Sequence, residues 1–349
     1  MNRQMMVLAA GMAGVLITTP IFAPTHAQRS GGRPSSSCVQ EIMRLCGRDR
    51  SQIPACLQSK GSSLSSKCQK EVAARMGQRM EQANGAAGGF QSGAKPTRTV
   101  LYGNEKRQQI DVYEPEGAVD DLPLVLFVHG GAWRMGDHKR VQSKPAHFGA
   151  QDIYFASTGY RVLPEAPVED QAKDVGLAVQ ALVGQASSIG FDPERIVIMG
   201  HSAGAHLAAL VSTDPQYAGD AFDAIKGVIL LDGAGYDIAK NLAEGAPQAK
   251  FMFEEAFGID PARHAALSPV TYVGGPDAPN WLALYVDTRA PAKAQAELLV
   301  GALNEAGSSA KAVAIANTDH GGMNRDIGTE TGAAQTQAVD AFLAEIFGS

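Results

Sequence analysis

The sequence has no cysteine outside residues 38–68, and its four cysteines form no closely spaced pair. Cys38, Cys46, Cys56 and Cys68 are separated by seven, nine and eleven residues, with no histidine between them. Structural zinc sites normally draw their ligands from closely spaced Cys or His pairs, so this spacing argues against a metal site. Two disulfides are the favoured interpretation if the protein matures in an oxidising compartment.

A long uninterrupted apolar run is also missing. The apolar stretch Met5–Ile21 is broken by glycines and by Pro20 before about 20 apolar residues accumulate, the length that a membrane-spanning helix needs. It follows Arg3 and precedes the small-residue pattern Thr25–Ala27, a combination typical of a cleaved secretory signal peptide over residues 1–27. We therefore expect an exported protein, periplasmic or secreted, with no transmembrane span after cleavage. An uncleaved membrane anchor is the alternative.

No motif of a nucleic-acid-binding protein occurs, and 45% hydrophobic and 19% charged residues are ordinary globular proportions. The charge is nevertheless unevenly distributed. Residues 28–98 contain 12 Lys or Arg and 4 Asp or Glu, whereas residues 99–349 contain 17 and 32. This asymmetry predicts that the basic segment contacts an anionic surface, such as a membrane face or an acidic polysaccharide, or docks on the acidic remainder. The alternative is that its charge only keeps a small module soluble.

Residues 28–82 are expected to form a small cysteine-rich helical module. Three helical patterns cover residues 38–46, 53–57 and 65–81. A module of this size buries little apolar surface, so two disulfides of about 2 to 4 kcal/mol each would supply much of its stability. Four cysteines allow three connectivities, and a helical hairpin favours Cys38 with Cys68 and Cys46 with Cys56. The pattern resembles the cysteine-rich repeat of some secreted and Golgi proteins.

Residues 83–96 are rich in Gly, Ala, Asn and Ser without apolar periodicity, which predicts a flexible linker. Over residues 97–349, short apolar runs alternate with helical patterns, as in a mostly parallel sheet flanked by helices. Eight strands are expected, at residues 100–102, 109–113, 124–128, 153–157, 195–199, 227–231, 281–286 and 312–315. Helices are expected at residues 170–188, 203–212, 292–306 and 335–347. Residues 236–279 interrupt the alternation and are expected to form a cap over the strand ends.

The segment Gly200–Gly204 has the pattern G-x-S-x-G between an expected strand and an expected helix. In that context the glycines permit a cramped turn that exposes the serine at the carboxyl edge of the sheet, a nucleophile elbow. The amino end of the following helix offers free N–H groups and a positive dipole end to developing negative charge. Ser202 is therefore the expected nucleophile.

The segment His129–Trp133 reads His-Gly-Gly-Ala-Trp, follows an expected strand and begins 73 residues before Ser202. Glycines there let the backbone approach a substrate carbonyl closely and direct N–H groups at it. Gly130 and Gly131, together with Ala203, are the expected oxyanion hole. A plain glycine turn is the alternative.

His320 lies on the loop Asn317–Gly322, just beyond the last expected strand. In hydrolases with this type of elbow the triad follows the order Ser, acid, His along the chain. The other histidines lie before the serine, in the elbow, in the helix after it or in the expected cap. His320 is therefore the expected general base.

Several aspartates compete for the role of the acid, namely Asp232, Asp237, Asp287 and Asp319. Asp287 directly follows the expected strand 281–286, so its carboxylate would lie at the carboxyl edge of the sheet near the loop of His320. Asp319 is adjacent to the histidine in sequence, so its side chain is expected to diverge from the imidazole. Asp287 is the favoured acid, and Asp232 is the alternative.

Three stretches in this order, His129–Lys139, Tyr160–Pro167 and Gly200–Leu207, resemble α/β-hydrolases. The similarity is to bacterial esterases of the hormone-sensitive-lipase type and to the kynurenine-formamidase-like branch. It covers about residues 97–349 and implies an α/β-hydrolase fold with an eight-stranded, mostly parallel sheet. It also implies a catalytic triad of Ser202, Asp287 and His320. The oxyanion hole would be formed by Gly130, Gly131 and Ala203.

His201 and Ala205 stand where the lipase-like branch commonly has Asp and Gly, which brings the elbow closer to the formamidase-like and small-ester branch. The sequence thus predicts a serine carboxylesterase that hydrolyses short-chain or aromatic esters through an acyl-enzyme, with no metal or organic cofactor. A formamidase or amidase of the same fold is the nearest alternative. A non-catalytic binding protein that keeps the fold is a third.

Overall fold

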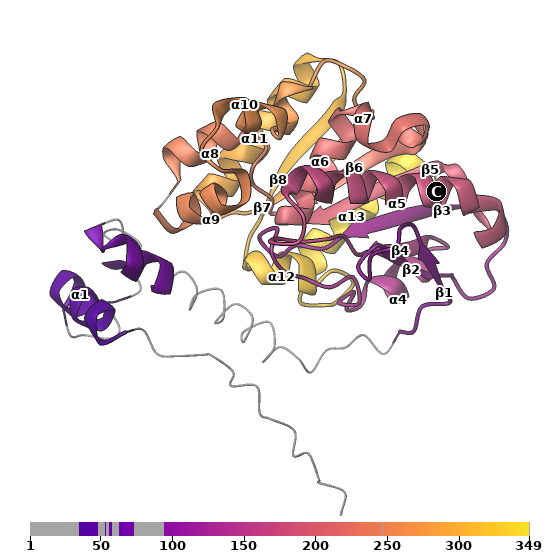
Figure 1. The fold of residues 1–349 in the computed structure, drawn as a ribbon. Helices are drawn as coiled ribbons and strands as arrows, with labels where there is room; N and C mark the ends of the chain where they lie inside the picture. Colours follow the sequence, from indigo (N-terminus) through magenta and orange to yellow (C-terminus); the bar gives the residue numbers. More distant parts are fainter. Residues whose placement is uncertain are drawn as a thin grey trace, which may run out of the picture. The chain divides into compact units, whose positions relative to one another are not determined.

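The computed structural model describes residues 35–47, 53, 56–57, 63–72, 94–245 and 247–348, which belong to the amino-terminal module and to a larger domain from residue 94 onward (Figure 1). The predicted signal peptide lies outside these residues, as do most of the predicted linker and the second half of the helix expected at residues 65–81. No helix in the described part of the chain is long and apolar enough to cross a membrane.

Two disulfides join the described residues of the module. Cys38 is bonded to Cys68 and Cys46 to Cys56, so the nested pairing is confirmed. Cys38 and Cys68 are buried with two leucines in a small apolar cluster. The cross-links therefore form part of the core of a module whose apolar interior is small.

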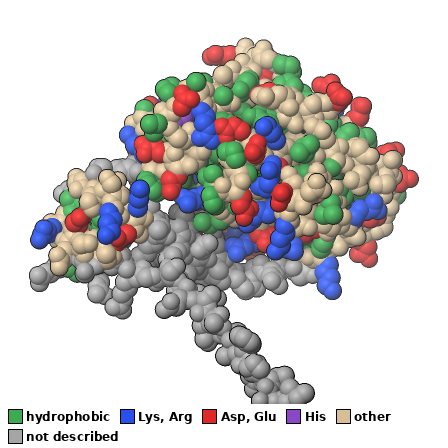
Figure 2. Space-filling model, viewed as in Figure 1, with side chains coloured by type: hydrophobic (Ala, Val, Ile, Leu, Met, Phe, Trp, Pro, Cys, Tyr) green, Lys and Arg blue, Asp and Glu red, His purple; other side chains and the backbone are tan. Residues whose placement is uncertain are grey.

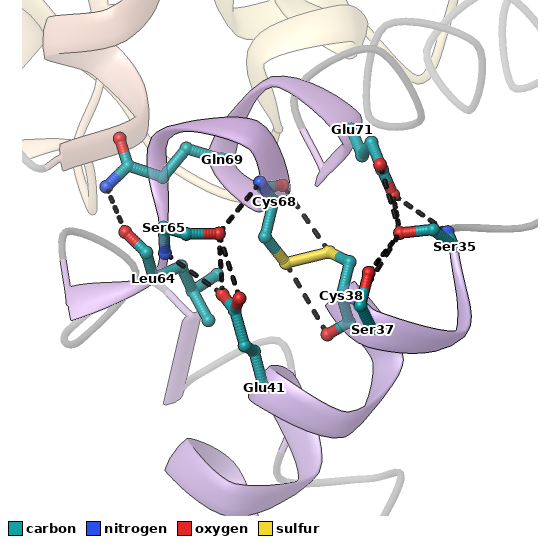
Figure 3. The surroundings of a disulfide bond; sticks show 9 residues. All are labelled: Ser35, Ser37, Cys38, Glu41, Leu64, Ser65, Cys68, Gln69 and Glu71. Atoms are coloured by element: carbon teal, nitrogen blue, oxygen red, sulfur yellow. Dashed lines mark hydrogen bonds between the residues drawn. A yellow bond between two sulfur atoms is a disulfide. The ribbon is translucent and has the colours of Figure 1, made fainter.

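Helix α1 (Ser36–Cys46) and the helix that begins after Ser65 start in the same way (Figure 3). The backbone N–H and the hydroxyl of Ser35 donate hydrogen bonds of 2.8 and 2.9 Å to Glu71, whose pKa they lower. The same groups of Ser65 donate bonds of 3.0 and 2.9 Å to Glu41. Each serine hydroxyl also accepts an N–H from three residues further on. The glutamate of each helix thus caps the start of the other helix, beside the disulfide that joins them.

The larger domain is built on one eight-stranded sheet (Figure 1). Its strands are β1 (Arg98–Leu101), β2 (Gln109–Tyr113), β3 (Leu122–Val128), β4 (Tyr154–Thr158), β5 (Phe191–His201), β6 (Ile225–Leu231), β7 (Asn280–Val286) and β8 (Ser309–Ile315). Their order is β1-β2-β4-β3-β5-β6-β7-β8, antiparallel from β1 to β4 and parallel from β4 to β8. The expected mostly parallel, eight-stranded sheet is confirmed.

Helices cover both faces of the sheet, which is why the central strands are continuous apolar runs. Along β3, Leu124 and Leu126 pack in one buried cluster, whereas Val125 and Phe127 pack in the other. The first cluster includes side chains of α5 (Val168–Ile189), α6 (Ala203–Thr213) and α11 (Ala290–Glu305). The second includes side chains of α4 (Lys144–Gly149), α12 (His320–Arg325) and α13 (Ala333–Phe347).

Short helices occupy the segment that was expected to form a cap, between β6 and β7. They are α8 (Ile238–Glu244), α9 (Pro247–Phe257), α10 (Pro261–Ala266) and a 3-10 turn at Pro269–Thr271, while α7 (Pro215–Ala218) and a 3-10 turn at Gly219–Ala224 precede β6. Phe253 and Phe257 of α9 meet the ring of Trp133, in the loop after β3, edge to face at 5.3 and 4.7 Å between centroids. The inserted helices are thereby attached to a loop at the carboxyl edge of the sheet.

Acidic and basic side chains are interspersed over the visible face of the larger domain (Figure 2). Two such pairs link the cap to the rest of the domain. Arg134, in the loop after β3, pairs with Glu255 of α9, and Arg263 of α10 donates a 2.8 Å hydrogen bond to Glu169 at the start of α5. Both pairs are partly exposed, so each is expected to contribute less than about 1 kcal/mol to stability. Buried contacts, such as those of Phe253, Phe257 and Leu267 in the main apolar cluster, are therefore expected to contribute more to the attachment of the cap than these ion pairs.

The disulfide pairing predicts that the mature protein contains no free thiol. Treatment of unfolded, unreduced protein with iodoacetamide should leave all four cysteines unlabelled, and peptide mapping should recover the Cys38–Cys68 and Cys46–Cys56 pairs. Labelling of all four cysteines without reductant would contradict the pairing.

Candidate active site

Ser202 lies in the turn between β5 and α6, where its backbone has a left-handed φ of 55°. A side chain at Gly200 would place its Cβ 2.3 Å from the carbonyl oxygen of Gly204, and one at Gly204 would lie 2.2 Å from that of Val128. Only glycine fits at either position, because the strand, the turn and the helix approach one another too closely for a Cβ. This packing explains the G-x-S-x-G pattern and gives the strained elbow that presents a serine at the end of a strand.

His320 is the first residue of α12 and faces the serine. Its Nε2 lies 3.0 Å from Ser202 Oγ, within hydrogen-bond distance. The neighbouring Asp319 is the N-cap of α12, and its carboxylate accepts a 2.6 Å hydrogen bond from the Gly322 N–H. The carboxylate of Asp319 is therefore engaged with the helix start, and the structure joins Ser202 to His320 as the sequence predicts.

Asp232, directly after β6, holds the other side of the imidazole. Its Oδ2 lies 2.7 Å from His320 Nδ1, and its Oδ1 accepts a hydrogen bond of 3.1 Å from the Val286 N–H. The side chain is fully buried, and the backbone has a left-handed φ of 47°. A buried carboxylate is costly unless it is hydrogen-bonded, and these contacts satisfy both of its oxygens.

The position beside His320 Nδ1 thus belongs to Asp232 and not to Asp287, which corrects the acid favoured from the sequence. Asp287 is exposed, and among the described residues no side-chain hydrogen bond joins it to His320. Both aspartates follow parallel strands at the same sheet edge. They differ in backbone and burial. Asp232 has a left-handed backbone and a buried carboxylate, whereas Asp287 lies at the surface.

Arg289 is a member of the site that the sequence analysis missed. It follows β7, and its Nη1 makes an ion pair with Asp232 Oδ2 and lies 2.6 Å from His320 Nδ1. Burial lowers the pKa of Arg289 below its usual value. The only sequence signal for this arginine is its position at the carboxyl end of a parallel strand, directly before α11.

Burial and the positive charge of Arg289 favour the neutral form of the His320 imidazole. Burial has the largest effect on its pKa, the positive charge of Arg289 acts in the same direction, and Asp319 opposes both, so that the pKa falls to about 4. A neutral imidazole can accept the serine proton at Nε2 while Nδ1–H donates to Asp232. At neutral pH the imidazole is therefore expected to be unprotonated, as a general base must be.

His201 supports the loop of the general base. Its Nε2 lies 2.8 Å from the carbonyl oxygen of His320, and the centroids of the two rings are 4.7 Å apart. Burial, followed by the charge of His320, lowers the pKa of His201 well below its usual value, so the ring is neutral. Because a carbonyl oxygen only accepts, Nε2 of His201 carries the hydrogen of this bond.

The glycine loop after β3 lies against the elbow. A Cβ at Gly130 would lie 2.7 Å from the carbonyl oxygen of His201 and 3.0 Å from Ser202 Cβ, and Gly131 has a φ of 139°. Ala203 follows the serine as the first residue of α6, where backbone N–H groups have no partner within the helix. The structure thus places Gly130 beside Ser202, which precedes Ala203, while Gly131 continues the glycine loop. The role of these three residues as an oxyanion hole stays a prediction.

Trp133 connects the glycine loop to the cap. Its indole N–H donates a 3.2 Å hydrogen bond to His206 Nδ1, and His206 Nε2 lies 2.8 Å from the carbonyl oxygen of Leu267. Burial lowers the pKa of His206 to about 4, so this bridge is uncharged. The neutral imidazole accepts from the loop and donates to the cap segment.

No group of three or more His, Cys, Asp or Glu side chains in the described part of the chain is arranged to hold a metal ion. The polar groups gathered around Ser202 are the hydroxyl, two imidazoles, one buried carboxylate and one guanidinium. Such a set supports nucleophilic attack on a carbonyl with general-base assistance.

The chain is similar to several known hydrolases and esterases. A model of the BD-FAE family matches residues 110–284, half of the chain. A probable isoprenylcysteine alpha-carbonyl methylesterase of Arabidopsis thaliana is 35% identical over 112 residues, which are 32% of this chain and 24% of that protein. The kynurenine formamidase of Danio rerio is 32% identical over 158 residues, 45% of this chain and 52% of that protein. The chain thus spans about a quarter and about half of the length of these curated relatives.

Among solved structures, esterase 2 of Thermogutta terrifontis phosphonylated by sarin is similar, with a TM-score of 0.61 and 22% identity. The similarity covers 74% of this chain and 96% of that one. It shows a shared fold, the α/β-hydrolase fold that the sequence predicts. The family match includes the glycine loop, the elbow and Asp232, and it ends before Arg289 and His320.

The geometry predicts that Asp232→Asn lowers kcat on p-nitrophenyl acetate by about 10⁴-fold, since an amide cannot hold the imidazole in the productive tautomer. Asp287→Asn is the matched control and should change kcat by less than about threefold. Steady-state kinetics of both variants beside the unmodified protein measure the difference. A larger loss of kcat in Asp287→Asn than in Asp232→Asn would identify Asp287 as the acid of the triad.

Proposed function

The chain belongs to the BD-FAE family and has the α/β-hydrolase fold, and from this premise we propose that it is a serine hydrolase that cleaves carboxylic esters. The proposal is carried by the hydrogen-bonded line from Ser202 Oγ through His320 to Asp232, with distances of 3.0 and 2.7 Å. The same arrangement performs acyl transfer on several unrelated folds. The methylesterase among the relatives supports an ester as the substrate.

In the proposed mechanism His320 Nε2 accepts the proton of the Ser202 hydroxyl as its oxygen attacks the ester carbonyl. Asp232 accepts the hydrogen of Nδ1 and stabilises the imidazolium that forms. The imidazolium then returns the proton to the departing alcohol, which leaves an acyl group on Ser202. A water molecule activated by the same imidazole releases the acid and restores the serine.

The charge that develops on the carbonyl oxygen would be stabilised by the backbone N–H groups of Gly130, Gly131 and Ala203. In comparable sites each such donor contributes about 3 to 4 kcal/mol to the stabilisation of the transition state. The close contact of Gly130 with the elbow supports this assignment, because it places the glycine backbone beside the serine. Attachment of the loop to the cap through Trp133 would hold these donors in position.

We propose esters of short-chain or aromatic acids as substrates, supported by the elbow residues His201 and Ala205, which resemble those of the small-ester branch. Formamide hydrolysis by the same triad is the second candidate, supported by the identity to kynurenine formamidase. The complete hydrogen-bonded triad argues against a non-catalytic binding protein.

We also propose that the chain is exported to the periplasm or secreted. The two disulfides support this, because such bonds persist mainly in oxidising compartments. Contact of the basic residues 28–98 with an anionic surface stays a prediction, since most of these residues lie outside the described part of the chain.

The proposal predicts that Ser202→Ala lowers kcat on p-nitrophenyl acetate by about 10⁴ to 10⁶-fold, because the nucleophile is removed. Circular dichroism should show an unchanged fold, since the elbow depends on Gly200 and Gly204. The unmodified protein should have a higher kcat/KM on p-nitrophenyl acetate, butyrate and benzoate than on an aryl formamide.

Two outcomes would change the proposal. Unchanged turnover by Ser202→Ala would exclude the serine mechanism, and a higher kcat/KM on the formamide than on all three esters would favour the second candidate.

A further inference from the structure

A positive charge lies behind the proposed triad. Arg289 lies between the end of β7 and the start of α11, and its guanidinium contacts both Asp232 and His320 Nδ1. The mechanism proposed above assigns this residue no step. A positive charge this close to Asp232 and His320 changes the protonation equilibria of both groups.

The two contacts of Arg289 are not equivalent. A guanidinium only donates hydrogen bonds and a carboxylate only accepts them, so Arg289 and Asp232 are natural partners. His320 Nδ1 must carry a hydrogen to bond Asp232 in the productive tautomer, and it then has no lone pair to offer Arg289 at 2.6 Å. The guanidinium therefore stabilises the ionised carboxylate directly and repels any second proton on the imidazole.

We propose that Arg289 is a positioning residue of the active centre that keeps Asp232 ionised and His320 neutral, so that the enzyme retains its general base in acidic surroundings. This inference rests on the proposed serine-hydrolase function and goes beyond it, because it assigns the pH range of the site to a residue outside the triad. Arg289 acts through Asp232 and His320 and not on the substrate.

The other charged and titratable groups around His320 do not provide this repulsion. On its own element, Asp319 favours the charged imidazole, and Arg325 forms an exposed ion pair with Asp326. From the end of β5, His201 is neutral. From α4, the buried amine of Lys144 donates a 2.7 Å hydrogen bond to the Asn324 carbonyl, and burial lowers its pKa to about 7. Among the described neighbours, Arg289 is the cation in direct contact with the imidazole.

The effect on the pH profile has a definite sign. Only the neutral imidazole accepts the serine proton, so kcat/KM rises with pH through the pKa of His320, which lies at about 4. Removal of the positive charge would leave Asp232 unneutralised beside the imidazole, which favours the imidazolium and raises the pKa of His320. The acid limb of the profile would then move to higher pH.

The test is the pH profile of kcat/KM on p-nitrophenyl acetate from pH 3.5 to 9, for the unmodified protein, Arg289→Gln and Arg289→Lys. The glutamine keeps hydrogen-bonding capacity without charge, and the lysine keeps the charge. In Arg289→Gln we expect the acid limb to move up by about one to two pH units, so that at pH 5 the variant reaches between about a half and about a tenth of its plateau. Arg289→Lys should restore the acid limb to within roughly half a unit of the unmodified profile.

A second readout does not depend on turnover. Nitrogen-15 NMR of histidine-labelled protein follows the titration of the His320 ring, assigned by comparison with His320→Gln. A rise of its pKa in Arg289→Gln and not in Arg289→Lys supports the inference. Coincident titrations in the unmodified protein and Arg289→Gln overturn it, since a purely structural role for Arg289 would lower activity without shifting the titration.

The two readouts also separate this inference from the proposed function. Absence of ester or formamide turnover in the unmodified protein would refute the serine-hydrolase function. The NMR titration would still decide whether Arg289 sets the charge of His320.

Discussion

Parallel pairing of the strands from β3 to β8 determines where the chemistry of this protein lies. Their carboxyl ends meet at one edge of the sheet, and each member of the site follows one of these ends. Gly130 comes after β3, Ser202 after β5, Asp232 after β6, Arg289 after β7 and His320 after β8. Residues as far apart in the sequence as Gly130 and His320 are brought together because five strands end side by side.

The buried carboxylate of Asp232 is the electrostatic centre of this arrangement. It is stabilised by the Val286 N–H, the ring of His320 and the guanidinium of Arg289, which belong to or follow two other strands. Loss of one of these partners would lower the stability of the folded protein, because water cannot replace the missing hydrogen bond to the buried carboxylate. We propose that the contacts which satisfy this buried carboxylate also set the tautomer and the charge of the His320 imidazole.

Much of this architecture could be predicted from the sequence, because its signals are local. Strands covered on both faces appear as short apolar runs, and the pattern Gly200–Gly204 follows directly from the lack of room for a Cβ at its two glycines. Ser202 and His320 could be identified in the same way, from a strand and the turn or loop that follows it. The repeat of Ser-x-x-Cys-x-x-Glu at residues 35–41 and 65–71 is a further local signal, which the exchanged helix caps explain.

The acid and its cationic neighbour could not be identified in this way. Asp232 and Asp287 both follow parallel strands, and what separates them is the left-handed turn of the chain at Asp232, which no residue type nearby requires. An arginine between a strand and a helix is equally compatible with solvent exposure, so the position of Arg289 in the sequence could not show that it contacts Asp232 at the end of the neighbouring strand β6. These assignments depend on tertiary packing, where the sequence pattern alone is ambiguous.

Covalent labelling tests most directly whether Ser202 is a nucleophile that His320 activates. The mature protein would be incubated with a fluorophosphonate, digested and mapped by mass spectrometry, beside His320→Gln as the variant without the base. One phosphonyl adduct is expected, on Ser202, and it should form at least about 100-fold more slowly in His320→Gln. Absence of an adduct on Ser202, or labelling at the same rate in His320→Gln, would contradict this assignment.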